Sequence, residues 1–303
     1  MGGRLALVRC VAAVMVSAVC SGSGPVTPGG QLILCGQDEL FILDVTKSPP
    51  AKVWSWRAAD RPELPDAIRS KFRSIDESKP VDGGSRILIT ASSDGVALID
   101  VKTGEAVFYA TAANAHSAEL LPGGRVVVAA SHRPQGEGDR LILFDLSKPD
   151  QALFHTELSW AHGVVWDSQR QLLWALSDRE LRGYKLAGWT TAAPSLVKTV
   201  VHDLPDSSGH DLFDVAGTAM LTLTTGRRCW MFDRDRGTFS PHPELADRPG
   251  VKCISVNPAT QQTVWVQSEG GNWWSNKLRF LHPEAILELP GERLYKARWL
   301  PSA

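Results

Sequence analysis

The chain has 303 residues, of which 43% are hydrophobic and 21% charged, so it can bury a large core. Its 32 lysines and arginines almost balance its 33 aspartates and glutamates, and the formal net charge is −1. This balance excludes a global field that would attract nucleic acid or an anionic membrane, so electrostatic specificity must be local. The sequence also contains no nucleotide-phosphate loop and no Gly-x-Ser-x-Gly nucleophile motif between a strand and a helix.

Residues 1–24 have the layout of a secretory signal peptide. Two arginines come first, a short apolar run covers residues 11–19, and small residues follow up to residue 24. The apolar run is too short to span a membrane comfortably, so we predict no transmembrane segment. The protein is therefore expected to be secreted or periplasmic. A lipid anchor at Cys20 is the alternative, although Val19 is bulky for the position before a lipidated cysteine.

Three cysteines remain after the leader, namely Cys35, Cys229 and Cys253. Their odd number and wide spacing fit neither a disulfide framework nor a zinc–cysteine site. A pair between Cys229 and Cys253 is one possibility, and three buried free thiols are the interpretation that we favour.

The mature chain alternates short β-rich runs with turn residues and shows no long helical period. Residues 31–36, 39–44 and 52–56 form the first set of predicted strands. In the next set, Asp94-Gly95 stands between two apolar runs, which is a strong hairpin signal. Later sets repeat this order, and several hairpins close on an acid, at Asp44, Asp100, Asp145 and Asp233.

These runs form six units of four strands, which predicts a six-bladed β-propeller that occupies residues 25–303 as a single domain. The first unit lacks an inner strand, and residues 295–301 look like an inner strand without a unit. Pairing the two ends would close the ring and hide its edge strands. A seven-bladed ring is the alternative, with a degenerate blade in residues 57–80. That connection is polar and more typical of a loop with a short helix.

Three histidines recur at the predicted starts of inner strands, namely His116, His162 and His210. Their intervals match one propeller blade, which is about 40–50 residues long. Inner-strand starts gather around one mouth of the channel. Counting back six residues from the turn proline of each unit places further residues there: Arg73 or Ser74, Lys252, and Tyr295 or Lys296.

Two chemistries suit this group of side chains. Three neutral imidazoles can bind a divalent metal (Mn, Zn or Ca) with one position open, which makes His116, His162 and His210 the candidate ligands. Alternatively, cations neutralise the carboxylate of a uronate while a histidine or tyrosine removes the proton beside it. Catalysis would then fall to the histidines and Tyr295, and carboxylate binding to Arg73, Lys252 and Lys296.

Other residues have supporting or competing interpretations. Nearby acids would orient the imidazoles from behind, namely Asp76, Glu77 and Asp211. Most of the eleven tryptophans are expected between blades, but Trp273 and Trp274 follow a Gly-Gly-Asn loop and would offer a sugar-stacking surface. A purely structural role, with each imidazole bonded to the backbone of the next blade, stays open.

The segments around the three histidines, residues 115–124, 161–167 and 209–212, resemble an uncharacterised family of secreted bacterial six-bladed propellers. The histidine-bearing mouth is more loosely similar to propeller polysaccharide lyases such as oligogalacturonate lyases, which hold a metal mainly with histidines. No motif is shared with those lyases, so no residue role is transferred.

This resemblance implies a secreted carbohydrate-active enzyme that cleaves a uronate-containing glycan by β-elimination. The alternative is a non-catalytic propeller that binds a glycan or a protein partner at the same mouth. We expect a monomer with no role for nucleic acid, and for the enzyme an anionic poly- or oligosaccharide ligand.

Overall fold

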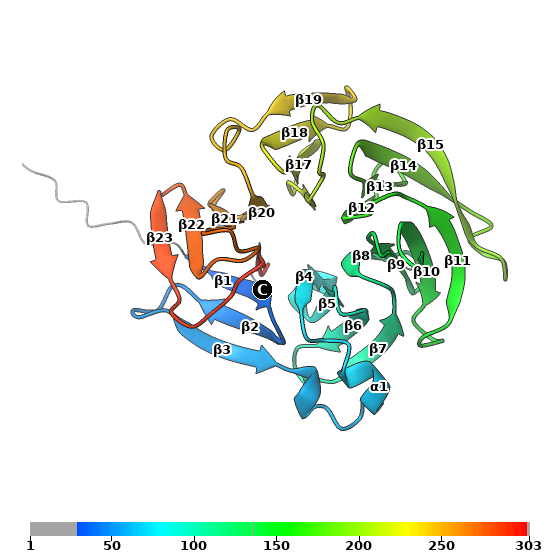
Figure 1. Cartoon of the computed structure of the whole chain (residues 1–303), viewed down its shortest axis with the longest axis horizontal. Helices are drawn as coiled ribbons and strands as arrows, with labels where there is room; N and C mark the ends of the chain where they lie inside the picture. The colour runs from blue at the N-terminus through cyan, green and yellow to red at the C-terminus, as the bar shows by residue number, and fades with distance from the viewer. Residues whose placement is uncertain (1–28, 135, 302–303) are drawn as a thin grey trace, which may run out of the picture.

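Six four-stranded antiparallel sheets surround a common axis, like the blades of a propeller (Figure 1). The structure is a computed structural model that describes residues 29–134 and 136–301. The predicted six-bladed β-propeller is confirmed. The predicted signal peptide and the lipid-anchor alternative at Cys20 lie outside the described residues.

Five blades run in chain order from the axis outward, and the sixth takes its inner strand from the end of the chain. The composite blade contains β24 (Lys296–Trp299), β1 (Gln31–Gly36), β2 (Glu39–Asp44) and β3 (Ala51–Trp56). The next two contain β4 (Ile75–Val81), β5 (Arg86–Ala91), β6 (Gly95–Asp100) and β7 (Ala106–Thr111), then β8 (Ala115–Leu121), β9 (Arg125–Ala130), β10 (Arg140–Asp145) and β11 (Ala152–Glu157).

The remaining three blades follow the same plan. They contain β12 (Gly163–Asp167), β13 (Leu172–Leu176), β14 (Glu180–Ala187) and β15 (Ser195–Asp203), then β16 (Asp211–Asp214), β17 (Met220–Thr224), β18 (Cys229–Asp233) and β19 (Thr238–Pro241), and last β20 (Val251–Val256), β21 (Thr263–Gln267), β22 (Lys277–Leu281) and β23 (Ala285–Glu288).

The two ends of the chain close the ring. Strand β24 pairs antiparallel with β1, with Leu32 opposite Trp299 and Cys35 opposite Lys296. Both strands thereby gain a hydrogen-bonded neighbour that an open array would leave exposed. The connection between β3 and β4 contains only the short helices η1 (Ala58–Asp60) and α1 (Asp66–Arg69). The seven-bladed alternative is therefore excluded.

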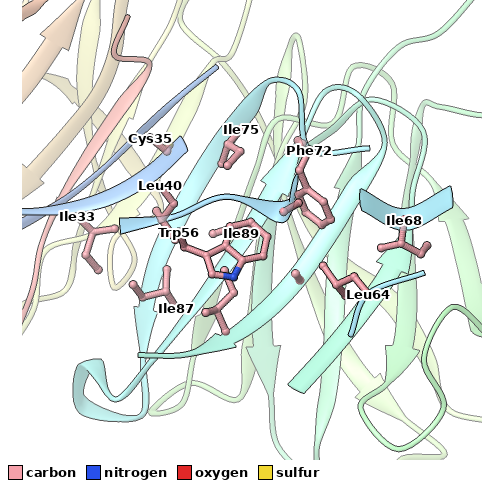
Figure 2. Packing of buried hydrophobic residues seen from close by; sticks show 14 of the residues in the cluster. Ile33, Cys35, Leu40, Trp56, Leu64, Ile68, Phe72, Ile75, Ile87 and Ile89 are labelled. Atoms are coloured by element: carbon pink, nitrogen blue, oxygen red, sulfur yellow. The ribbon is translucent and has the colours of Figure 1, made fainter. Parts of the chain in front are cut away.

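Apolar side chains fill the seams between neighbouring blades. At the first seam Trp56 packs edge-on against Phe72, with ring centroids 5.6 Å apart, among isoleucines from both blades (Figure 2). The Trp56 indole N–H donates to the Gly104 carbonyl at 3.1 Å, so this buried donor is satisfied. Gly95 is needed here, because a Cβ on it would lie 2.6 Å from the Lys71 carbonyl oxygen.

The three described cysteines are buried and free, so the possible pair between Cys229 and Cys253 is wrong. Burial raises the pKa of Cys35 and Cys229 to about 12 and that of Cys253 to about 11. These thiols stay protonated at neutral pH and act as small apolar side chains. Within the described part of the chain, no helix is long and apolar enough to cross a membrane.

Candidate functional site at the mouth of the central axis

Each blade contributes one side chain where its inner strand begins. In three blades this residue is bulged out of the strand pairing, at Asp76 in β4, His116 in β8 and Lys252 in β20. A bulge bends the strand and redirects its side chain, and such bulges are frequent beside active sites. In the other three blades the residue stands directly before the strand and its backbone N–H donates to the neighbouring strand, at His162, His210 and Tyr295.

These side chains meet at a single mouth. The imidazole centroids of His116 and His162 lie 4.4 Å apart, and those of His162 and His210 lie 5.1 Å apart. The Lys252 ammonium donates to Nε2 of His210 at 2.8 Å, and the Tyr295 hydroxyl lies 3.1 Å from the same nitrogen. We call this group the mouth ring, defined as Asp76, His116, His162, His210, Lys252 and Tyr295.

A repeated backbone device positions the histidines. Two residues before each histidine the backbone takes a left-handed φ, at Asn114 (49°), Trp160 (48°) and Ser208 (67°). An aspartate from the preceding blade accepts the N–H of that residue, over 2.9 Å from Asn114 to Asp94, 2.6 Å from Trp160 to Asp139, and 2.9 Å from Ser208 to Asp178. The histidines are thus fixed by contacts between blades, which explains why they recur with the blade period.

Two of the histidines have a defined tautomer. Nδ1 of His116 lies 2.9 Å from the Asn114 carbonyl oxygen, and Nδ1 of His162 lies 2.9 Å from that of Trp160. A carbonyl oxygen only accepts, so each Nδ1 must carry the proton and donate it. Nε2 is then a free acceptor in both rings. The bond to the backbone of the next blade, considered from the sequence, is not the one that forms. Each Nδ1 instead binds the carbonyl two residues earlier in its own segment, which leaves Nε2 available.

All three imidazoles are neutral at neutral pH. Burial lowers the pKa of His116, which Asp76 partly offsets. Burial also lowers the pKa of His162 well below its usual value, with His116 adding to the effect. The pKa of His210 is also lowered well below its usual value, first by burial and second by the charge of Lys252. A neutral imidazole can accept a proton, so the mouth ring contains potential general bases.

The two hydrogen-bond donors of the mouth ring, Lys252 and Tyr295, also have shifted pKa values. Burial and then the charge of Lys296 lower the pKa of Lys252 to about 8. Burial and the nearby carboxylate of Asp76 raise the pKa of Tyr295 well above its usual value. Tyr295 is therefore a protonated phenol, and Lys252 is a cation that can lose its proton near neutral pH. Perturbed groups of both kinds in one place are typical of functional sites.

A layer of buried charges closes the axis beneath the mouth ring. Arg298 donates two hydrogen bonds to Glu77, both of 3.0 Å, and two to Asp211, of 3.1 and 2.6 Å. Lys296 pairs with the same two carboxylates at 3.0 and 2.8 Å. We call these four residues the charged floor. Next to it Lys79 pairs with Glu119 at 3.0 Å.

Several sequence-based placements need correction. The ring position of the second blade belongs to Asp76 and not to Arg73 or Ser74, because Pro80 is still paired inside β4 whereas Pro122 lies in a turn. Arg73 is exposed, and its backbone N–H donates to the Ser93 hydroxyl at 2.9 Å.

Lys296 lies one residue beyond the ring position, in the charged floor, and Tyr295 takes the ring position. Glu77 and Asp211 likewise bind Lys296 and Arg298, so they do not orient an imidazole. Asp76 stays close enough to His116 to influence its pKa.

The mouth ring does not fit a metal ion as it is arranged here. The Lys252 ammonium already lies against Nε2 of His210, where a metal would have to bind, and its charge would repel a cation. In the described ranges no group of three or more His, Cys, Asp or Glu side chains could hold a metal. The metal stays a prediction from residue types.

Two exposed tryptophans border the mouth ring. Trp273 is 41% exposed and contacts Tyr295 edge-on, with centroids 5.5 Å apart. Its partner in sequence, Trp274, is half-buried and lies under the Arg293 guanidinium at 5.2 Å. Trp160 is 47% exposed and shares a pocket of about 370 Å³ with His162 and His210. Only the first of the predicted pair therefore faces the mouth.

The sequence places Asp76 behind the imidazoles and does not reveal that it takes a ring position itself. It also gives no role at the mouth to Trp160, because large side chains usually fill propeller seams. The bulge that brings Asp76 into the ring leaves no residue signature. The backbone device that holds the histidines does have a sequence signal. Asp94, Asp139 and Asp178, which accept the backbone N–H two residues before each histidine, all stand between the second and third strands of successive blades.

Comparison with known proteins places the chain in a family without giving it an activity. The model of a family of unknown function, DUF6528, matches residues 28–302. The chain belongs to that family. No curated protein matches this DUF6528 chain.

Among solved structures, the DUF6528 chain is similar to one in the crystal structure of a nidogen/laminin complex, with a TM-score of 0.59 and 14% identity. The match covers 90% of this chain and 98% of that one. At this identity the likeness shows the propeller fold alone, and a fold does not determine function. The similarity to polysaccharide lyases stays a prediction.

Proposed function

We propose that the mouth ring binds a uronate residue of an anionic glycan and cleaves the chain there by β-elimination. One observation carries the proposal: a cation, Lys252, and a phenol, Tyr295, both lie within hydrogen-bond distance of Nε2 of the neutral imidazole of His210. Elimination next to a carboxylate needs a charge to neutralise the carboxylate, a base for the adjacent proton, and an acid for the leaving oxygen. No metal is required for this set.

In the first step the carboxylate of the uronate draws the Lys252 ammonium away from Nε2 of His210. An ion pair with a carboxylate is stronger than a bond to a neutral nitrogen, so the exchange is favourable. It also neutralises the carboxylate and acidifies the proton on the adjacent carbon. The freed Nε2 lone pair can then accept that proton, because burial keeps the imidazole neutral.

In the second step the C–H electron pair becomes the new C=C bond of the sugar, and the glycosidic C–O bond breaks with its electrons on oxygen. Tyr295 donates its phenolic proton to that oxygen, since its raised pKa keeps it protonated. The proton held by His210 returns to the phenolate, directly or through water, and the site is restored. No water molecule is consumed, and the new chain end is an unsaturated uronate.

Export, which the N-terminal residues predict, would bring the protein into contact with extracellular glycans. The proposal would hold for a secreted or a periplasmic protein. Cell fractionation with an antibody against the mature chain separates both from a protein that is retained inside the cell.

The test is incubation with a panel of uronate polymers, including pectate, alginate, glucuronans and glycosaminoglycans. We expect one of them to yield the ultraviolet absorbance of a conjugated unsaturated uronate. His210→Gln and Lys252→Met should each lower kcat/KM by at least about 100-fold, the range of a removed acid–base group. Arg73→Met is the matched control, because Arg73 lies outside the mouth ring, and it should retain activity.

A non-catalytic binding site is the second candidate. It is favoured by the exposed Trp160 and Trp273 at the mouth, since exposed aromatic residues are frequent at binding surfaces. The propeller found in the nidogen/laminin complex also occurs together with a protein partner. If no polymer gives an unsaturated product but one binds, and binding is lost in Lys252→Met, the second candidate replaces the first.

A further inference from the structure

Trp160 occupies a backbone conformation that suits a different residue. Its φ of 48° lies in the left-handed region, where large side chains are disfavoured. The same position in three other blades is occupied by Asn114, Ser208 and Gly250, which are small. A strained residue persists only where its surroundings hold it, and such residues cluster at functional sites.

The indole forms a rigid surface that faces solvent. It stacks on His132 with ring centroids 4.6 Å apart and an interplanar angle of 19°. Asp139 fixes both partners, accepting from the backbone N–H of Trp160 at 2.6 Å and lying 2.8 Å from Nδ1 of His132. Despite these contacts Trp160 is 47% exposed. The surroundings hold the ring in place while leaving much of it free to contact a ligand.

This surface forms one wall of a pocket that continues into the mouth ring. The pocket measures about 370 Å³ and is lined by Trp160, His162, Asp178, Ser208, Gly209 and His210. Its volume falls within the range of small-molecule sites, about 300–1,000 Å³. We call it the Trp160 pocket. Two of its lining residues are mouth-ring histidines, so a ligand here would contact the sugar bound at the ring.

The polar groups of the pocket favour hydroxyl donors over carboxylates. Asp178 accepts the Ser208 N–H through Oδ1 at 2.9 Å, and its Oδ2 lies 3.3 Å from Nε of Arg179. Each carboxylate oxygen has a further lone pair that can accept a hydroxyl proton. The ion pair with Arg179 offsets the charge of Asp178, and none of the six lining residues is a lysine or arginine that would bind the carboxylate of a uronate. Lys252, the cation of the mouth ring, does not line the pocket and lies against Nε2 of His210.

We propose that the Trp160 pocket is a subsite for a neutral pyranose, so that the preferred glycan carries a neutral sugar beside the uronate. One face of the ring would lie on the Trp160 indole, and two of its hydroxyls would donate to Asp178. This proposal rests on the proposed function for the identity of the neighbouring sugar. It predicts alternating or branched heteropolymers as better ligands than polymers of uronate alone.

The experiment measures binding of single sugars by saturation-transfer NMR, with the full mature protein. The probes are the methyl pyranosides of glucose, galactose, mannose and N-acetylglucosamine, together with methyl glucuronide and methyl galacturonide. We expect at least one neutral glycoside to bind the wild type. Trp160→Asn, which suits the left-handed φ, should weaken that binding at least about tenfold, as should Asp178→Asn. Ile286→Ala is the control, because Ile286 is 59% exposed on the outer strand β23, and it should retain that binding.

The fold of each variant is verified by its thermal midpoint, so a loss of binding cannot be attributed to unfolding. The proposal is overturned if no neutral glycoside binds the wild type, or if Trp160→Asn binds as tightly as the wild type. If neutral glycosides bind through Trp160 while no polymer yields an unsaturated product, the subsite proposal holds and the lyase proposal fails. If an unsaturated product forms equally fast in Trp160→Asn and in the wild type, the lyase proposal holds and the subsite proposal fails.

Discussion

Replacing Arg298 with methionine tests whether the charged floor holds the inner strands together. Arg298 is 0% exposed and connects Glu77 of one blade to Asp211 of another. Burial alone would raise the pKa of Glu77, but Arg298 and Lys296 hold it below its usual range. Without the guanidinium, two buried carboxylates share only Lys296. Removing one partner of a buried ion pair costs about 3–5 kcal/mol, and we expect a loss of that size.

The assay is urea unfolding at pH 7, in which the midpoint reports the loss while an unchanged slope shows that two-state behaviour persists. Arg228→Met is the control, because Arg228 pairs with Asp247 at 2.9 Å but is 49% exposed. An exposed pair is worth about 0–1 kcal/mol. Equal small losses in both variants would show that the floor contributes little to stability and that our reasoning about it is wrong.

Two further predictions concern pH. The pKa values of His116, His162 and His210 are lowered in the folded state, so below about pH 6.5 the unfolded chain binds protons that the folded chain does not. The free energy of unfolding should therefore fall as pH falls below about 6.5. His162→Gln should make this fall less steep, and an equally steep fall in the variant would refute the assignment. The pKa of Lys252 is lowered to about 8, so affinity for an anionic substrate should fall as pH rises through that value. Lys252→Arg should extend binding to higher pH, and an unchanged KM profile would contradict that role.

Periodicity in the sequence was sufficient to predict the fold. Alternating runs, the Asp94-Gly95 hairpin and the spare strand at 295–301 predict blade number and ring closure, because each reflects local backbone preference. The three histidines also gather as their spacing predicts, since the blade repeat places equivalent residues around one mouth.

Details of the site depended on features that residue types do not reveal. Pro80 is paired inside β4 whereas Pro122 lies in a turn, so counting back from Pro80 pointed to the wrong residue. Lys296 and Tyr295 are neighbours in sequence, yet one enters the charged floor and the other the mouth ring. The left-handed φ of Trp160 has no sequence signature either. A one-residue change of register reverses the direction of a side chain, so the residue that points into the mouth at each strand start can be identified only from the structure.

The central claim is that the mouth ring forms one binding site for an acidic sugar. Proton–nitrogen NMR of the imidazoles tests it with galacturonate and glucuronate, which have no glycosidic leaving group and cannot be cleaved. We predict that His116, His162 and His210 remain neutral at pH 7, with Nδ1 protonated in His116 and His162. Their signals should shift together on addition of one uronate, while those of the exposed His155 and His282 stay unchanged. Signals from the mouth ring that do not move with either sugar, or that move no more than those of His155 and His282, would contradict the claim.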